Sequence, residues 1–320
     1  MKTTEPMIEL EQASRRYGSV EALKAVSLRV EQGETVGLLG RNGAGKTTAL
    51  NLMTGYLPPT EGKVKIRGMD MLTSPRECKR MIGYLPEKPP LYDEMTVEEY
   101  LTFVSELREV VRHANRAHVN EIMELCGLAD MRHRVIGHLS KGYRQRAGIA
   151  SALCGAPEIL ILDEPTVGLD PKQTVEMREL IRRLGEEHTV LFSSHLLPEV
   201  QQLCSRVMIL HEGRLVRTMD LGAEDEGDAV RLRLCAAGNA EKLKAALGRL
   251  ECVTEVKSLP SGAGEAEFSL TCRRGDGNGR PEDRIFRLLA GMDAPVRRLT
   301  EERDTLEEVF LRETEGEVVL

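Results

Sequence analysis

Short apolar runs and apolar alternation recur through the first 220 residues of the chain. Apolar and polar residues alternate at 7–10 and 26–30, and mainly apolar runs cover residues 35–39, 159–162 and 189–192. Alternation predicts half-buried strands, whereas short apolar runs predict strands covered on both faces, as in parallel sheets. Because helical stretches separate these strands, we expect an α/β fold with much of the sheet parallel.

One stretch within this region has helical rather than strand character. Residues 97–111 and 116–126 place apolar side chains at helical spacing and contain few strand-forming residues. We expect them to belong to a helical subdomain, set apart from the sheet, over about residues 88–155.

The sequence changes near residues 222–228, where glycine and acidic residues predict a linker. We therefore expect one domain over residues 1–222 and a smaller one over 223–320. In the smaller domain the pattern predicts strand, helix, strand, strand, helix and strand at 230–235, 240–249, 253–258, 265–271, 282–292 and 296–299. That order is the ferredoxin-like α+β plan. A closing helix at 305–312 places Leu306, Val309 and Phe310 on one face, as expected of a docking helix.

Composition narrows the class of protein. A chain of 320 residues with 41% hydrophobic and 30% charged residues is typical of a globular protein of two domains. Its net charge of −7 does not favour a nucleic-acid partner. The first residues lack the apolar segment of a signal peptide, and no apolar run is long enough to span a bilayer, so we expect a cytosolic chain. The seven cysteines form no Cys-x-x-Cys pair and are interpreted as reduced thiols.

The segment GRNGAGKTT at residues 40–48 follows a predicted strand and precedes a predicted helix, and it fits the phosphate-binding P-loop pattern. In that pattern backbone N–H groups and the helix N-terminus face the phosphates of a nucleotide, while a lysine adds a positive charge and a hydroxyl binds Mg²⁺. A glycine-rich turn with an incidental lysine is the alternative. The predicted nucleotide-binding residues are Gly40, Asn42, Gly43, Ala44, Gly45, Lys46, Thr47 and Thr48.

Two adjacent acids end the apolar run at 159–162, in the segment ILILDEP. Asp163 is placed to hold Mg²⁺ beside Thr47, and Glu164 is placed to act as the general base on an attacking water. The alternative for adjacent acids is a solvated strand end, but the four aliphatic residues before them favour a buried approach to a site. The sequence thus predicts a P-loop enzyme that binds a nucleoside triphosphate and Mg²⁺, and a P-loop kinase or GTPase is an alternative on these motifs.

Over about residues 7–220 the chain resembles the ATP-binding subunits of ABC transporters. The segment LSKGYRQR at 139–146 is similar to the signature sequence of that family, and it lies between the two nucleotide motifs. The resemblance implies that Ser140 and Gly142 cap the ATP bound by a second subunit, so that a dimer is part of the active site. It also implies that Asp170, in GLDP, couples the two sites and that His195 contacts the γ-phosphate as a catalytic residue with Glu164 and Lys46.

One further residue matches the family, and two features depart from its usual sequence. Tyr17, in RRYG at 15–18, matches the aromatic residue that stacks on adenine in the family; a surface turn tyrosine is the alternative. The signature has Lys141 and Tyr143 where the family usually has glycine and glutamine. Glu87, at the end of IGYLPE, stands where the family commonly has glutamine, and an ionised carboxylate accepts but cannot donate hydrogen bonds. We expect Glu87 to contact the nucleotide or Mg²⁺.

The end of the chain, with DTLEEVF at 304–310, resembles the ABC-2 exporter group, which includes drug, polysaccharide and gliding-motility export ATPases. The resemblance implies a peripheral subunit, paired with a second nucleotide-binding subunit, on the cytoplasmic face of the inner membrane beneath ABC-2 type permease subunits. We expect a homodimer, and a pair of different chains is the alternative. A non-transporting relative that acts on ribosomes or DNA is the alternative. Translation factors of that kind generally carry two nucleotide domains, and DNA-repair relatives carry long coiled coils; neither feature is found here. The sequence does not name the transported substrate.

Overall fold

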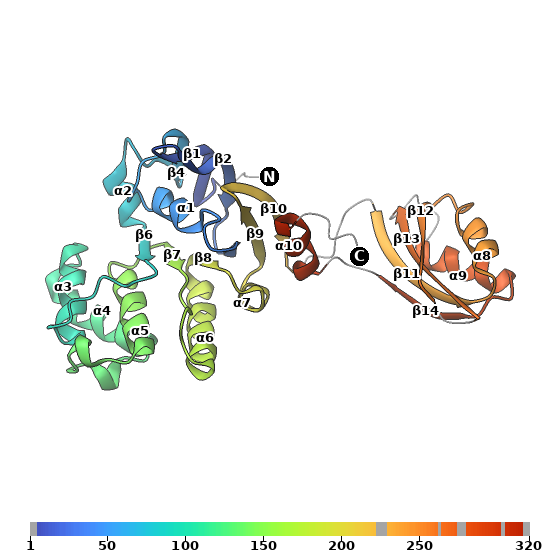
Figure 1. Ribbon diagram of the computed structural model, residues 1–320. Coiled ribbons are helices and arrows are strands. Elements are labelled where there is room, and N and C mark those ends of the chain that lie inside the picture. The colour runs from blue at the N-terminus through green and yellow to red at the C-terminus, as the bar shows by residue number, and fades with distance from the viewer. Residues whose placement is uncertain (1–4, 222–228, 262–263, 274–279, 302–304, 316–320) are drawn as a thin grey trace. The chain divides into compact units, whose positions relative to one another are not determined.

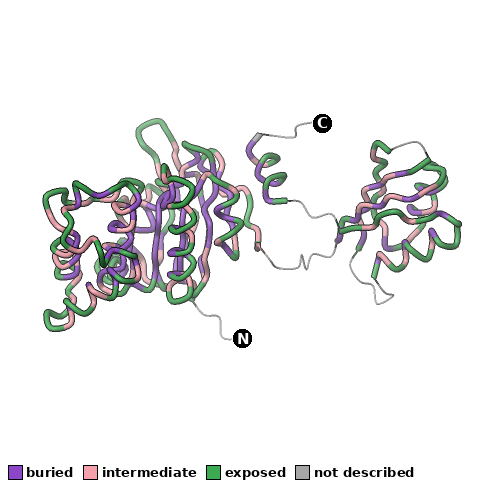
Figure 2. The backbone as a smooth tube through the Cα atoms, turned by 90° about the horizontal axis from the view of Figure 1, so that it is seen from below, coloured by how far each residue is buried: buried purple, intermediate pink, exposed green. Residues whose placement is uncertain are grey.

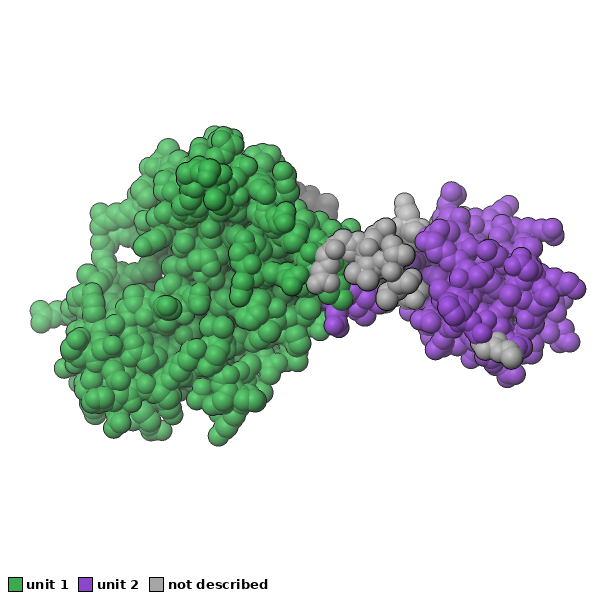
Figure 3. Space-filling model, in the orientation of Figure 1, with its two compact units in different colours: residues 1–221, 310–320 green, residues 222–309 purple. Residues whose placement is uncertain are grey.

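A computed structural model describes residues 5–221, 229–261, 264–273, 280–301 and 305–315. The predicted linker at 222–228 lies outside the described residues. The chain forms two units, one made of residues 1–221 and 310–320 and the other of residues 222–309 (Figure 3). No helix in the described part of the chain is both long and apolar enough to cross a membrane.

A six-stranded sheet crosses the first unit in the order β10-β9-β3-β8-β7-β6 (Figure 1). Neighbouring strands from β9 to β6 are parallel, and β10 pairs with β9 in the antiparallel sense. The strands are β3 (Thr35–Leu39), β6 (Ile82–Leu85), β7 (Ile159–Asp163), β8 (Thr189–Ser194), β9 (Arg206–His211) and β10 (Arg214–Asp220). Because Leu39 pairs with Ser194 and Asp163 with Ser193, the carboxyl ends of three strands meet at one edge of the sheet.

A four-stranded antiparallel sheet in the order β2-β1-β4-β5 shares its core with the parallel sheet. Its strands are β1 (Ile8–Tyr17), β2 (Val20–Val30), β4 (Glu61–Ile66) and β5 (Met69–Asp70). Helix α1 (Lys46–Met53) contributes Ala49, Leu50 and Leu52 to that core, and all three are fully buried. Buried residues accordingly run along the strands in the interior of this unit (Figure 2).

The expected α/β fold with a helical subdomain is confirmed by the path of the chain between β6 and β7. This stretch contains α3 (Val97–Leu107), α4 (Arg112–Leu125), the short 3-10 turns η1 (Ala129–Met131) and η2 (Ile136–His138), and α5 (Lys141–Leu153), which group together in Figure 1. Helix α3 begins at residue 97, as predicted, because Thr96 and Glu99 form a reciprocal capping box. The other helices of this unit are α2 (Pro75–Arg80), α6 (Pro171–Glu187) and α7 (Leu197–Leu203).

The second unit contains one antiparallel sheet, in the order β12-β13-β11-β14, with helices on one face (Figure 1). Its elements are β11 (Ala229–Ala237), α8 (Ala240–Leu247), β12 (Val253–Leu259), β13 (Glu265–Arg273), α9 (Pro281–Gly291) and β14 (Val296–Glu301). Leu243 and Leu247 of α8 pack with Leu289 of α9 and Phe268 of β13 in a separate apolar core. The closing helix is α10 (Leu306–Glu315), which is assigned to the first unit from Phe310 onward. Leu306, Val309 and Phe310 of this helix are buried.

The boundaries of several elements differ from those that the sequence predicts. Strands β1 and β2 extend over ten and eleven residues, well beyond the expected 7–10 and 26–30. The reason is their pairing with each other, which continues through polar residues as far as Tyr17 and Val20. Helix α3 ends at Leu107 rather than at residue 111, since Glu109 adopts a positive φ of 61° that ends the helix.

Candidate nucleotide-binding site

The P-loop occupies the turn between β3 and α1. Gly45 is the N-cap of α1 with φ 106°, in the left-handed region that favours glycine, and a Cβ there would lie 2.7 Å from the carbonyl oxygen of Ala22. The turn also holds the lysine side chain in place. Lys46 Nζ donates to the carbonyl oxygens of Gly40 at 2.7 Å and Arg41 at 3.3 Å. The ammonium group is therefore fixed at the N-terminus of α1, where a phosphate would bind.

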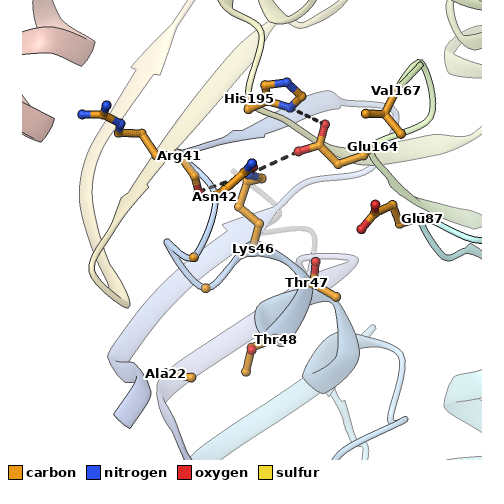
Figure 4. A pocket seen from close by; sticks show the side chains of 12 residues that line it. Ala22, Arg41, Asn42, Lys46, Thr47, Thr48, Glu87, Glu164, Val167 and His195 are labelled. Atoms are coloured by element: carbon orange, nitrogen blue, oxygen red, sulfur yellow. Dashed lines mark hydrogen bonds and ion pairs between the residues drawn. The ribbon is translucent and has the colours of Figure 1, made fainter. Parts of the chain in front are cut away.

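Glu164 follows β7 directly and has an unusual backbone. Its φ of 48° lies in the left-handed region, which is uncommon for a residue other than glycine and is found at functional sites. Its backbone N–H donates to Ser193 Oγ at 2.9 Å, a buried contact that helps to hold this conformation. The strained turn directs the carboxylate toward the P-loop (Figure 4).

Two cationic or polar groups converge on the Glu164 carboxylate, one from the first residue of α1 and one from the residue after β8. Lys46 Nζ lies 3.2 Å from Oε1, and His195 Nδ1 lies 2.8 Å from Oε2 (Figure 4). Because an ionised carboxylate only accepts, Nδ1 carries the proton of this bond, and a ligand would be contacted by Nε2. Lys46 and Glu164 are buried, and His195 is partly exposed, so the acid is shielded while the histidine is accessible.

Asp163 lies behind this cluster at the end of β7. Its Oδ1 accepts a 2.6 Å hydrogen bond from Ser193 Oγ, and its Oδ2 is buried without a hydrogen-bond partner among the described residues. Burial raises the pKa of Asp163, and the nearby Glu164 and Glu87 carboxylates raise it further, while hydrogen bonds from Ser193 and Thr47 lower it. An unpaired, buried carboxylate oxygen near a hydroxyl and a second acid is a suitable ligand for a hard cation.

These residues fit Mg²⁺ bound mainly through water and phosphate. Among the described residues, no group of three acidic, histidine or cysteine side chains could enclose a metal ion. Magnesium does not need such a group, since it commonly keeps several waters and takes one or two protein ligands beside nucleotide phosphates. The hydroxyl of Thr47 with the carboxylates of Asp163 and Glu87 would supply those ligands.

A cavity of about 380 Å³ opens at this edge of the sheet. The residues of the cavity wall that the sequence predicted are Asn42, Gly43, Gly45, Lys46, Thr47, Thr48, Glu87, Glu164 and His195. Three others were not predicted: Ala22, Arg41 and Val167. The Arg41 guanidinium points away from Lys46 and Glu164, so this residue contributes mainly its backbone (Figure 4).

The remaining predicted residues lie outside the described wall of the cavity. Gly40 and Ala44 support the P-loop through their backbones, the first by accepting from Lys46 and the second by accepting from Gly213 N at 2.9 Å. Tyr17 lies at the end of β1 with 44% of its surface exposed. Asp163 stands behind the wall.

Ser140, Gly142 and Asp170 mark the N-termini of two neighbouring helices. Ser140 is the N-cap of α5, and Asp170 is the N-cap of α6, where its carboxylate accepts from Gln173 N at 2.9 Å. Gly142 lies beneath the same glutamine, because a Cβ on Gly142 would be 2.8 Å from Gln173 Cδ. Helices α5 and α6 thus touch within one chain, and Ser140, Gly142 and Asp170 lie outside the cavity that Lys46 lines.

Ala22 and Ser193 gave only weak signals in the sequence. Arg15 pairs with Leu23 and Arg16 with Glu21, so Ala22 is the extra residue of a β-bulge, and bulges commonly redirect side chains beside active sites. Nothing in an alanine within a strand predicts that placement. Ser193 could have been found from its position, since it is a polar residue near the end of an apolar strand. It therefore lies at the same edge of the sheet as Asp163, the last residue of β7.

Comparison with known proteins places this arrangement in context. A family described as "ABC transporter" matches residues 23–167. The ABC transporter ATP-binding protein NatA of Bacillus subtilis (strain 168) is 41% identical over 216 residues, which are 66% of this chain and 88% of that protein. The bacitracin transport ATP-binding protein BcrA of Bacillus licheniformis is 40% identical over 212 residues, 66% of this chain and 68% of that protein.

Solved structures show the same fold. The dimeric bacterial ABC transporter cassette MJ0796 is 27% identical, with a TM-score of 0.63, and the match covers 68% of this chain and all of that one. MJ0796 has also been solved as a dimer bound to ADP and Pi in a post-hydrolysis state. These matches cover about two thirds of the chain.

Proposed function

Because the chain belongs to the ATP-binding subunits of ABC transporters, we propose that the residues gathered around Glu164 carry out its ATPase reaction. The protein is an ABC transporter ATPase. The observation that supports the assignment most strongly is the convergence of Lys46, at the start of α1, and His195, after β8, on the two oxygens of one strained and buried glutamate.

Each residue has a distinct part in this proposal. Backbone N–H groups of residues 40–48 and the ammonium of Lys46 bind the phosphates, and Glu164 accepts the proton of the attacking water. His195, oriented by Glu164 through Nδ1, presents Nε2 to the γ-phosphate. Mg²⁺, held by Thr47, Asp163 and Glu87, would neutralise phosphate charge. Glutamate at position 87 adds a negative charge at the cation where an amide would be neutral.

The complete site requires a second subunit. Ser140 and Gly142 begin α5 outside the cavity of their own chain, which suits a role at the ATP of a partner, and Asp170 would link the two sites. MJ0796 forms a dimer, which supports this arrangement. We propose a homodimer that closes on two ATP molecules and opens after hydrolysis.

Export is the proposed direction of transport. BcrA is named for bacitracin transport and LnrL of Bacillus subtilis (strain 168) for linearmycin resistance, and the latter is 32% identical over 254 residues. We place the chain in the ABC-2 exporter group, at the cytoplasmic face of the inner membrane, beneath separate permease subunits. The ATPase domain would span residues 1–222 and an accessory domain residues 223–320.

The accessory domain is proposed to be ferredoxin-like. Its βαββαβ order and its antiparallel sheet, in which the first and third strands of the domain are central, support that plan. Its part in the transport cycle is regulation or support of the dimer.

Mixing two inactive variants tests the shared site. Lys46→Met damages the P-loop side and Ser140→Arg damages the signature side, so each homodimer should lose phosphate release. An equimolar mixture contains heterodimers with one intact composite site, and we expect phosphate release to return in the mixture alone. Continued inactivity after exchange of subunits has been verified would contradict the trans arrangement.

Purification of the intact chain from gently solubilised native membranes tests the transport role. We expect polytopic membrane proteins to be recovered with it and identified by mass spectrometry. Recovery with ribosomes or DNA, and with no membrane protein, would leave the ATPase assignment and remove the transport assignment.

A further inference from the structure

Tyr17 lies at the end of the β1–β2 hairpin, in the same hairpin as the cavity residue Ala22. The cross-strand partner of Tyr17 is Val20, two residues before Ala22. The tyrosine is 44% exposed, a large fraction for an aromatic residue. An exposed ring at the end of a hairpin needs a second contact to hold it in one orientation.

Arg15 provides that contact. Its guanidinium carbon lies 5.1 Å from the centroid of the Tyr17 ring, which is within the range of a cation–π interaction. Arg15 Nη1 also donates to the carbonyl oxygen of Pro58 at 2.8 Å. Its Nε is buried and has no hydrogen-bond partner in the described part of the chain. The position of the guanidinium is therefore set by the ring on one side and by Pro58 on the other.

Pro58 belongs to the segment that leaves α1, the helix after the P-loop. This segment is fixed to β1 by two further bonds, from Thr60 N to Ser14 O at 2.8 Å and from Arg16 N to Thr60 Oγ1 at 3.1 Å. The aromatic ring is thus connected through Arg15 to the same part of the chain that carries the phosphate-binding lysine. A rigid connection of this kind fixes the distance between a base platform and a phosphate site.

We propose that Arg15 is a positioning residue for ATP. Its guanidinium stacks on one face of the Tyr17 ring and prepares the opposite face for the adenine base. This inference rests on the proposed ATPase function and on the role that the family resemblance implies for Tyr17, which is stacking on adenine. Two aromatic faces repel through their negative quadrupoles when they stack directly. A guanidinium on the far side of the tyrosine attracts the negative charge of the ring face and holds the ring in one orientation. Stacking with an electron-rich purine therefore becomes more favourable.

The sequence offers a matched control in the next residue. Arg16 is also an arginine of β1, with a more exposed side chain than Arg15, but its partners are Glu21 at 3.2 Å and Glu61 at 3.8 Å. Arg15→Met removes the charge beneath the ring, and Arg16→Met removes an equal charge elsewhere. Arg15→Lys keeps the charge and loses the planar group, so its effect should be intermediate.

The protein contains no tryptophan, so Tyr17→Trp introduces a single indole whose emission reports on the ring. The experiment titrates this variant, alone and combined with Arg15→Met or Arg16→Met, with MgATP and with magnesium tripolyphosphate, and measures binding by emission and by calorimetry. Steady-state assays of the same arginine variants, in the protein that keeps Tyr17, give KM and kcat.

We expect MgATP to change the emission and tripolyphosphate to leave it unchanged. Arg15→Met should weaken MgATP binding and raise KM about two- to fivefold, the effect of an exposed cation–π contact, without altering kcat or the affinity for tripolyphosphate. Arg16→Met should leave all four quantities unchanged.

If Arg15→Met weakens the binding of both ligands equally, or if MgATP binds without any change in emission, the proposal is wrong while the ATPase assignment stands. Absence of MgATP binding by calorimetry in the unmodified protein would instead contradict the proposed function. If Arg15→Met lowers the melting temperature, Arg15→Lys and Arg15→Gln provide the same comparison in a folded protein.

Discussion

Strands β7 and β13 illustrate the difference between the two units. Every residue of β7, from Ile159 to Asp163, is buried. Along β13, in contrast, buried residues such as Phe268 and Leu270 alternate with more accessible ones. The parallel sheet is covered on both faces and the antiparallel one on a single face, so only the first can hold a charged group at a strand end away from water.

The distribution of buried polar side chains follows the same division. Within the described residues, all buried polar and charged side chains lie in the first unit, and Lys46, Asp163, Glu164 and Ser193 are among them. Buried side chains of the second unit are apolar or cysteine. Burial of charge is costly unless the groups are paired, and here Lys46 and Glu164 pair with each other at 3.2 Å. The comparison indicates that buried polar groups suited to a reaction lie in the first unit, whereas the described interior of the second unit serves packing.

The largest effect is expected from Glu164→Gln. Loss of a general base lowers turnover by about 10²- to 10⁴-fold, while the amide can still bond to His195 and should allow ATP to bind. Phosphate release and nucleotide binding measured on the same preparation check this. Glu158→Gln is the matched control, because Glu158 is exposed and paired with Arg67 at 2.8 Å just before the same strand. Turnover retained in Glu164→Gln would mean that another group activates the water.

Phe268→Ala tests the second unit. Phe268 is fully buried in the apolar core, so truncation should cost about 3–5 kcal/mol of stability in that unit and leave ATP turnover by the first unit unchanged. Differential scanning calorimetry and an ATPase assay measure the two quantities. Phe286→Ala is the control, since Phe286 is 58% exposed and its loss should cost less than about 0.5 kcal/mol. A loss of turnover at a temperature where both units are folded would contradict the division described above.

Ser193→Ala should affect stability and chemistry together. The variant removes the donor to Asp163 and the acceptor of Glu164 N–H, and leaving such buried groups unpaired costs about 1–3 kcal/mol. Because the strained turn at Glu164 loses its support, kcat should fall more than the affinity for ATP. Thermal unfolding and steady-state kinetics give both values. Ser258→Ala, at an exposed position of β12, should change neither, and equal behaviour of the two variants would remove the special role of Ser193.

The smallest effect is expected in the pH dependence of stability. The pKa of Asp163 is raised by burial above its usual 3.8, so its ionisation destabilises the folded state. Below pH 3.8 the group is protonated in both states and has no effect; as pH rises through the raised pKa, the penalty develops in full. Asp163→Asn removes the penalty. The melting temperature of this variant relative to the wild type should therefore increase between about pH 4 and neutral pH, and a constant difference would contradict the role of burial.

Much of the site follows from local sequence. The P-loop residues, Asp163 and Glu164 lie at ends of apolar strands, where the order of strand, turn and helix predicts their chemistry. The helical subdomain was recognisable from periodicity. Longer β1 and β2 strands could not be predicted because their pairing with each other, rather than their own apolar pattern, determines where they end.

Residues whose function depends on contact between distant segments were not predictable. Ala22 reaches the cavity through a bulge that exists only in the pairing of β1 with β2, and Arg15 meets Tyr17 and Pro58 only after β1 has folded against the segment that leaves α1. Likewise, Lys46 and His195 are separated by 149 positions in the sequence, yet both contact the Glu164 carboxylate. The sequence by itself determined which chemical groups the site contains, because each group is placed by the strand or helix next to it. Only the tertiary structure decided which of them touch, because the order of strands in the sheet brings together ends that are far apart along the chain.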